Sequence, residues 1–157
     1  MKNSKSLIYG VLAAFLLGSL VFPTLLAAGE KPAELSRYGN PLTWVHLGQV
    51  KVKAEVVFSP EKLYLGLGKR QGLPEGQGML FVMPARVIQE FCMRDMRFAI
   101  DFIWLLPGRV VGITKNVPFE NQQACYASPE AVNYVLEVPA GFCDRHGIKV
   151  GDPASWK

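Results

Sequence analysis

The sequence predicts a mainly β protein: a compact β-sandwich or partly closed barrel with one or two short helices, preceded by one N-terminal transmembrane helix. Three observations lead to this prediction. Residues 7–28 form an apolar run without a charge. From Leu42 onward, short apolar runs alternate with turn residues, as is typical of strands. From Leu42 onward, residues 60–67 are the best candidate for a short helix.

Composition and charge narrow the class of protein. The chain has 157 residues, of which 50% are hydrophobic and 19% charged, which excludes a disordered charged tail. The net charge is +4, and Lys2 and Lys5 supply two of those charges ahead of the apolar run. The remaining charges nearly balance and form no basic field, so we expect no nucleic-acid partner.

The apolar run has the length of a membrane span. As a helix its 22 residues would extend about 33 Å, enough to cross a hydrocarbon core of about 30 Å. A retained anchor is favoured, because the run exceeds the usual apolar core of a signal peptide. A cleaved signal is the alternative, with a cleavage site at Ala27-Ala28-Gly29 before Glu30. A buried core helix is the third interpretation. Small residues on the anchor would allow contact with other transmembrane helices: Gly10, Ala13, Ala14 and Gly18.

The flanking charges predict the side of the membrane. Lysines before a span favour a cytoplasmic N-terminus, so the following domain lies outside the cytoplasm, on the periplasmic side. We therefore divide the chain into an anchor or signal at residues 1–28, a linker at 29–41 and a β domain at 42–157.

The first half of the domain is expected to hold strands and one helix. Residues 49–58 alternate, with Val52 and Ala54 on the apolar face and Glu55 on the polar face. Residues 60–67 form the helix candidate, with Ser59 as its N-cap. A loop at residues 73–78 leads to an apolar strand at 79–83, which Pro84 is expected to end.

The second half continues the same pattern. Strands are expected at residues 90–93, 98–106, 109–114 and 133–138, with a turn at Pro107-Gly108. Residues 116–129 read as irregular, residues 142–147 as one helical turn, and residues 149–152 as a turn.

The cysteines and histidines indicate no metal site and no cofactor. Cys92, Cys125 and Cys143 allow three disulfide pairings, or serve as small buried hydrophobes. The chain has no CxxC, and its two histidines are far apart in sequence, so a zinc site is not expected.

Two carboxylates interrupt apolar runs and are candidate ligand-binding residues. Asp101 lies in FAIDFIWLL, where a carboxylate must be paired, hold backbone N–H groups or face a cavity. Arg94 and Arg97 are its candidate partners. Glu137 lies in YVLEV and faces either solvent or a cavity. If the two carboxylates met at one cleft, they would suit acid–base hydrolysis.

Arg94 and Asp95 are also candidate ligand-binding residues. They follow one another at the end of a predicted strand, where such a pair can recognise a polar ligand. A surface ion pair is the alternative, and Asp95 also suits a turn.

An ordered series of short motifs resembles the family known as domain of unknown function 192. The series runs Gly66-Leu67, Gly78 to Phe81, Phe91 to Asp95, Ile100 to Ile103, Val135 to Glu137, Ala140-Gly141 and Gly147 to Asp152. The family pattern runs roughly R-G-L-M, G-M-L-F, F-W-M-K-N-T, P-L-D-I, V-L-E, A-G and G-I-x-x-G-D. The resemblance covers residues 51–153.

The resemblance implies a small β fold of sandwich type, often behind a signal peptide or a single span, and it supplies no activity. Asp101 and Glu137 match the family's aspartate and glutamate. The chain departs from the pattern in the third motif, where Cys92, Arg94 and Asp95 replace tryptophan, lysine and asparagine, and Met96 stands at the threonine. If that segment lines a pocket, its ligand preference is changed.

Three functions follow as hypotheses. The favoured one is an accessory subunit of a membrane protein complex, tethered by residues 7–28. The second is an extracytoplasmic module that binds a small polar ligand through Arg94, Asp95, Asp101 and Glu137. The third is a hydrolase that uses Asp101 and Glu137. No catalytic residue is assigned by the first two.

Overall fold

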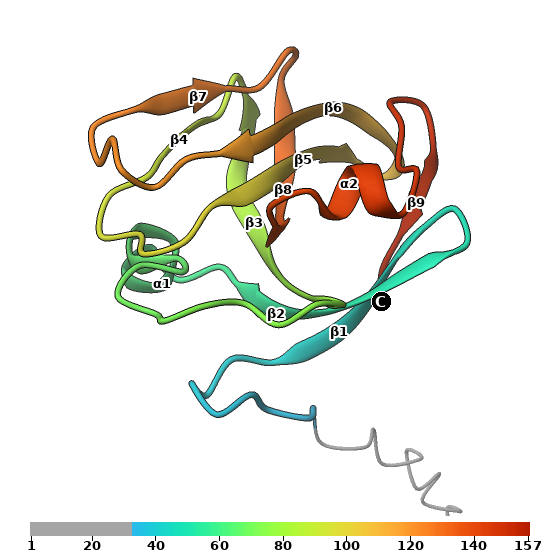
Figure 1. Ribbon diagram of the computed structural model, residues 1–157. Helices are drawn as coiled ribbons and strands as arrows, with labels where there is room; N and C mark the ends of the chain where they lie inside the picture. The colour runs from blue at the N-terminus through green and yellow to red at the C-terminus, as the bar shows by residue number, and fades with distance from the viewer. Residues whose placement is uncertain (1–32) are drawn as a thin grey trace, which may run out of the picture. The chain divides into compact units, whose positions relative to one another are not determined.

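The computed structural model describes residues 33–157, which form a closed seven-stranded barrel with a two-stranded ribbon on its outside (Figure 1). The predicted anchor and its packing residues Gly10, Ala13, Ala14 and Gly18 lie outside the described residues. Among residues 33–157, no helix is both long enough and apolar enough to cross a membrane.

The barrel strands are ordered β1-β2-β3-β8-β5-β6-β9. The elements in chain order are β1 (Leu42–Leu47), β2 (Val50–Val57), α1 (Pro60–Leu65), β3 (Gln77–Val87), β4 (Glu90–Cys92), β5 (Ile100–Leu106), β6 (Gly108–Val117), β7 (Cys125–Ala127), β8 (Val132–Pro139), α2 (Phe142–Arg145) and β9 (Pro153–Ser155). β4 and β7 pair only with each other and form the ribbon. The predicted β class and short helices are thus confirmed, and the barrel is closed rather than partly open.

One connection is parallel, and α1 makes it possible. β2 and β3 pair in parallel, from Lys53 opposite Gln77 to Val57 opposite Phe81. A parallel pair needs a crossover, and the chain places α1 and its following loop there. Ser59 is the N-cap of α1, as predicted, and its hydroxyl accepts a hydrogen bond from the Lys62 backbone N–H.

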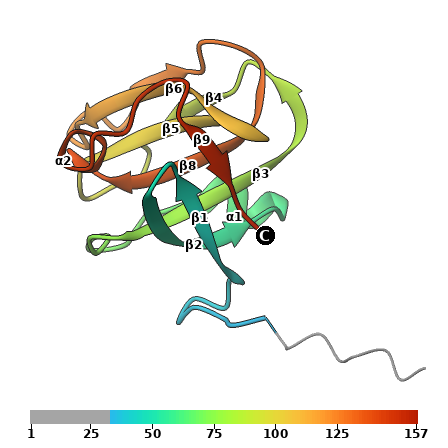
Figure 2. The same cartoon turned by 90° about the vertical axis from the view of Figure 1, so that its right-hand side faces the viewer.

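The inside of the barrel is one apolar core. Each of the seven barrel strands contributes at least one buried side chain, including Val45, Leu80 and Ile103. α2 adds Phe142 and Cys143 to the same cluster. Figure 2 shows the barrel from a second side, with α2 at one end of it. Burial on this scale supplies the main stabilising term of the domain, because apolar area removed from water contributes about 25 cal/mol per Å².

A second apolar cluster lies on the outer face of β3, β5 and β8. It contains Phe81, Phe102 and Trp104, and the rings of Phe91 and Tyr126 from the ribbon pack edge-on or tilted against it. The ribbon therefore covers part of the barrel wall and keeps that wall from water. β5 is accordingly buried on both faces, which explains its continuous apolar sequence.

Two predictions were wrong, namely that Pro84 ends its strand and that residues 116–129 are irregular, and the short strand β9 was not predicted. Pro84 does not end its strand: β3 runs on to Val87, because the β3–β8 register shifts between Val82 and Val87 and no ladder bond is needed at the proline. β7 lies in the segment expected to be irregular. β9 follows a predicted turn and closes the barrel by pairing with both β1 and β6. Strands of three residues are too short for a periodic signal.

Candidate functional site

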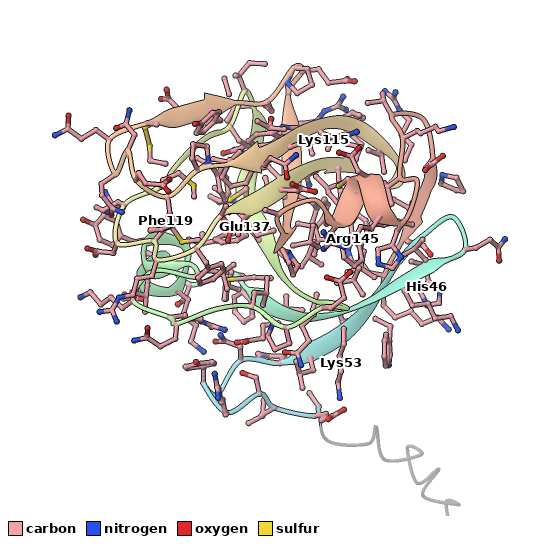
Figure 3. The ribbon with its side chains drawn as sticks, viewed as in Figure 1. His46, Lys53, Lys115, Phe119, Glu137 and Arg145 are labelled. Carbon is pink, nitrogen blue, oxygen red and sulfur yellow. A yellow bond between two sulfur atoms is a disulfide. The ribbon has the colours of Figure 1, made fainter. Side chains whose placement is uncertain are left out.

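Glu137 lies on the outer wall of the barrel, where side chains are expected to be apolar. In the strand register Met79 and Phe102 are its direct neighbours on the two sides, so all three side chains share one face. The residue is only 6% exposed, which excludes the solvent-facing interpretation. Figure 3 labels Glu137 near the centre of the view.

A cavity of about 160 Å³ opens beside Glu137. We call it the Glu137 cavity. Its lining comes from α1 and the loop after it, from β3, from residues 90–96 and from β8; it includes Tyr64, Phe81, Met83, Phe91, Arg94, Met96 and Glu137. The walls are mostly apolar and aromatic, with few polar groups, which is the usual composition of a small-molecule site.

Two glycines allow the loop after α1 to approach the rest of the site. Gly66 has φ 51°, and a Cβ there would lie 3.2 Å from the Phe81 ring. A Cβ on Gly68 would lie 2.8 Å from the Leu65 carbonyl oxygen and 3.3 Å from the Asp95 Cβ. A larger residue at Gly68 would push the loop away from residues 94–95 and change the cavity wall.

The Glu137 carboxyl group lacks the partners that a buried charge requires. Its Oε2 is buried and has no hydrogen-bond partner among residues 33–157. Burial raises the pKa of Glu137 to about 8, and the positive charge of Arg70 lowers it only in part. The group is therefore mostly protonated at pH 7 and presents one O–H donor and one carbonyl acceptor.

Arg94 lies at the rim of the same cavity. Its guanidinium group stacks over the Tyr64 ring, 3.9 Å from the centroid, and Nη2 makes a 3.5 Å contact with the Tyr64 carbonyl oxygen. Arg94 forms no ion pair within residues 33–157, and Asp95 is exposed beside it in a left-handed turn with φ 60°. The structure thus brings Arg94 and Glu137 to one cavity and leaves Asp95 outside its lining.

Asp101 is placed elsewhere and has a different environment. Its side chain is fully buried and accepts three backbone N–H bonds: Oδ1 from Asn116 at 2.7 Å and from Gly141 at 3.0 Å, and Oδ2 from Cys143 at 2.9 Å. This is the predicted alternative of a carboxylate that holds backbone groups. Neither Arg94 nor Arg97 is its partner.

Asp101 and Glu137 point to opposite faces of the barrel wall. Asp101 is opposite Val138 in the β5–β8 register, whereas Glu137 is opposite Phe102. Because neighbouring residues of a strand alternate between faces, the two carboxylates cannot meet at one cleft. They do not form the acid–base pair of the hydrolase hypothesis.

The cysteines resolve into one disulfide and one thiol. Cys92 and Cys125 are bonded across the β4–β7 ribbon, and Cys143 is free and buried in the barrel core. Burial raises the pKa of the Cys143 thiol far above its usual range, and the nearby Asp101 raises it further, so this thiol is unreactive. Cys92, which stands where the family has tryptophan, therefore cross-links β4 to β7 over the second apolar cluster.

Sequence reasoning missed several residues of the site. Tyr64, Phe81 and Phe91 line the cavity. Phe81 belongs to the second family motif and Phe91 to the third, so the motifs contained a signal for both residues. Glu55 was assigned to a polar face, yet it is 9% exposed and accepts two hydrogen bonds from the Arg70 guanidinium. No local pattern links residues 55 and 70, so only the fold reveals that pair.

Residues 33–157 contain no group of three or more His, Cys, Asp or Glu side chains that could hold a metal ion.

Comparison with known proteins places the fold. The family model of DUF192, described as an uncharacterized ACR family, matches residues 43–156. A crystal structure of a protein of unknown function from Novosphingobium aromaticivorans is 24% identical, with a TM-score of 0.74 over 80% of this chain and 94% of that one. A Sinorhizobium meliloti protein described as a "putative transcription regulator" is 26% identical, with a TM-score of 0.70 over 78% of this chain and 97% of that one. No curated protein matches the chain.

The motifs that match the family meet at two places. The residues of these motifs that line the Glu137 cavity are Gly66, Leu67, Phe81, Phe91, Cys92, Arg94, Met96 and Glu137. Asp101 and Gly141 meet through a hydrogen bond at the start of α2. The first place has an opening and an unpartnered polar group, whereas the second is closed and satisfied.

Proposed function

We propose that this chain, which belongs to the DUF192 family, uses its barrel as an extracytoplasmic binding domain that takes a small polar ligand in the Glu137 cavity. One observation carries the proposal: Glu137 Oε2 is buried beside a cavity with no hydrogen-bond partner. An unsatisfied buried polar group costs about 1–3 kcal/mol, and a ligand that pairs with it recovers that cost.

The groups at the cavity select the ligand's chemistry. A protonated Glu137 can donate one hydrogen bond and accept another, as a carboxylic acid or amide partner requires. Arg94 adds guanidinium donors at the rim, which favour a carboxylate or carbonyl oxygen. The cavity of about 160 Å³ admits only a few non-hydrogen atoms, and its aromatic walls suit an apolar remainder. Small carboxylic acids and amides are the ligand class.

The test uses the full chain purified in mild detergent, with acetate and acetamide as probes in protein-observed NMR titrations. We expect saturable shifts in residues that line the Glu137 cavity. Glu137→Leu should abolish them, and Glu137→Gln, which keeps a donor and an acceptor, should retain binding of acetate. Glu120→Gln is the matched control, because Glu120 is exposed and outside the cavity. Absence of shifts, or equal shifts in Glu137→Leu, would refute the proposal.

The location outside the cytoplasm is part of the proposal. The Cys92–Cys125 disulfide supports it, because disulfides persist in oxidising compartments and are rare in the cytosol. The uncharged run at residues 7–28 supports a transmembrane anchor ahead of the domain. The mass of the mature chain, isolated from native membranes, tests the anchor: an intact N-terminus supports it, and a chain that starts near Glu30 replaces it with a cleaved signal.

An accessory subunit of a membrane protein complex is the second candidate function. It is favoured by exposed aromatic surface on β1 and next to β9, where Trp44 is 52% exposed and lines a hollow of about 610 Å³ with Trp156. Exposed aromatic side chains are enriched at protein interfaces. Purification in mild detergent followed by mass spectrometry tests this candidate: companions in fixed stoichiometry support it, and a chain that migrates alone refutes it.

A further inference from the structure

A second hollow, of about 390 Å³, lies between residues 37–40, the end of α1 and the loop that follows it. We call it the basic cavity. Four cationic side chains line it: Arg37, Lys62, Lys69 and Arg70. No Asp or Glu is among its lining residues. It shares Leu65, Gly66 and Gly68 with the Glu137 cavity, so the same loop separates the two hollows.

Within residues 33–157, one of the four positive charges is neutralised by an ion pair. The Arg70 guanidinium binds both carboxylate oxygens of Glu55, with Nη2 3.1 Å from Oε2. Lys62 Nζ donates to the Gly39 carbonyl oxygen at 3.1 Å, and Arg37 Nη2 donates to the Tyr38 hydroxyl at 2.7 Å. These two partners are neutral, and Lys69 has no ion pair within residues 33–157. Three uncompensated charges in one hollow attract an anion.

Two of the cations, Arg37 and Arg70, are held against the Tyr38 ring. The Tyr38 ring has the Arg70 guanidinium 3.8 Å and the Arg37 guanidinium 4.8 Å from its centroid. Glu55 Oε2 also accepts hydrogen bonds from the Asn40 side chain at 2.7 Å and from the Ser36 hydroxyl at 2.9 Å. These hydrogen bonds hold residues 36–40 against β2, and residues 37, 38 and 40 line one side of the basic cavity.

An independent feature of the same wall indicates a ligand hydroxyl. Asn40 lines the basic cavity and is only 4% exposed, and its Oδ1 is buried with no hydrogen-bond partner among the residues that the structure describes. Its Nδ2 is already engaged by Glu55, which orients Oδ1 as a free acceptor. The Asn40 Oδ1 acceptor can bind a hydroxyl donor, and the cations of the basic cavity can bind an anionic group. A ligand that carries both a hydroxyl and an anionic group would therefore make both interactions.

We propose that the basic cavity binds a phosphate ester that carries a hydroxyl group, of the glycerol phosphate type. The phosphate would contact Arg37, Lys62 and Lys69, and the hydroxyl would donate to Asn40 Oδ1. The ligand source is a soluble glycerol phosphate or the headgroup of a membrane lipid. The uncharged run at residues 7–28 is the reason to test the lipid source beside the soluble one.

The binding test uses the full chain in neutral detergent and isothermal titration with sn-glycerol 3-phosphate. Glycerol and inorganic phosphate each supply one half of the recognition and should bind at least tenfold more weakly. The double variant Arg37→Gln/Lys69→Gln should weaken binding at least tenfold. The matched control Lys51→Gln/Arg97→Gln removes two exposed charges outside the basic cavity and should change binding less than twofold. Equal weakening by the two double variants would overturn the proposal, because it would indicate unspecific charge attraction.

A second experiment separates the two sources. The full chain is placed in nanodiscs of phosphatidylcholine, with or without phosphatidylglycerol, and amide hydrogen exchange is measured at residues 36–40 and 62–71. Protection that requires phosphatidylglycerol assigns the lipid headgroup, and protection by soluble glycerol 3-phosphate in phosphatidylcholine discs assigns the soluble ester. No protection in either case would overturn the proposal. Glu137→Leu should leave these results unchanged, which keeps this inference independent of the proposed function.

Discussion

The backbone N–H of Cys143 donates a 2.9 Å hydrogen bond to Oδ2 of Asp101, so a carboxylate on β5 holds the first turn of α2. Oδ1 of the same carboxylate accepts from the backbones of Asn116 and Gly141. One side chain therefore joins β5, β6 and the start of α2 at one end of the barrel. Asp101 acts on the stability of the fold, and Glu137 is the carboxyl group that faces a cavity.

Replacement of Asp101 by alanine should destabilise the domain strongly. The substitution removes the acceptor of three backbone N–H groups, of which that of Cys143 lies in a buried residue. A buried unpaired N–H costs about 1–3 kcal/mol and each of the other two lost bonds about 1 kcal/mol, so we expect a loss of about 3 kcal/mol or more. Urea unfolding measures the loss, and amide hydrogen exchange should accelerate most at Asn116, Gly141 and Cys143. A loss below about 1 kcal/mol would show that water or rearrangement satisfies these groups.

The stability of the domain should fall as pH rises from 5 to 8 because of Glu137. Burial raises the pKa of Glu137 from 4.5 to about 8 in the folded state, so the folded protein binds more protons than the unfolded chain in this range. The contribution is present at low pH and is lost as pH rises through the folded-state pKa, by about 3 kcal/mol between pH 5 and 8.

Glu137→Gln supplies the comparison for that prediction, because glutamine does not titrate. Urea unfolding of both proteins at several pH values isolates the Glu137 contribution as the difference between the two curves. We expect the unfolding free energy of wild type minus that of Glu137→Gln to fall by about 3 kcal/mol from pH 5 to pH 8. Parallel curves over the whole range would mean that Glu137 titrates at an ordinary pKa, and that the carboxyl group reaches water.

Arg70→Gln should destabilise the domain, because it leaves the Glu55 carboxylate without its ionic partner. Breaking one side of a buried ion pair costs about 3–5 kcal/mol, and the lower end is expected here because Asn40 and Ser36 still donate to Glu55. Burial alone raises the pKa of Glu55, and the hydrogen bonds from Arg70, Asn40 and Ser36 bring it below the ordinary value.

The pH dependence of that variant follows from the lowered pKa. The stabilisation is present above pH 4.5 and is lost as pH falls through the folded-state pKa of Glu55. The difference in unfolding free energy between wild type and Arg70→Gln should therefore be largest near pH 6 and smaller below pH 4. A difference that does not change with pH would assign the effect of Arg70 to packing against Tyr38.

Reduction of the Cys92–Cys125 disulfide should lower stability by about 3 kcal/mol, because the bond closes a loop with a sequence separation of 33 residues. Thermal unfolding with and without dithiothreitol measures the effect. Cys92→Ser should reproduce it, and the reductant should then have no further effect. Cys143→Ala is the control, since its buried thiol forms no disulfide and its response to reductant should match wild type.

The strands and α1 were predictable because their signals are local. Alternation from Val50 to Val57 and the Ser59 cap depend on residues within one or two turns of each other. Glu137 could be selected as a candidate because a carboxylate in an apolar run is unusual anywhere. The environment of Glu137 could not be predicted, because Phe91, which lines the cavity beside it, lies on β4 and is distant from Glu137 in the sequence.

By itself, the sequence determined the β class, the short helices, the family and the set of carboxylates that break apolar runs. Only the tertiary structure decided that three residues at β9 close the barrel and that Cys92 pairs with Cys125. It also decided that Asp101 holds backbone while Glu137 faces a cavity. The reason is physical: strand alternation is encoded within a few residues, whereas closure, disulfide pairing and the burial of a charge depend on segments that meet only when the chain folds.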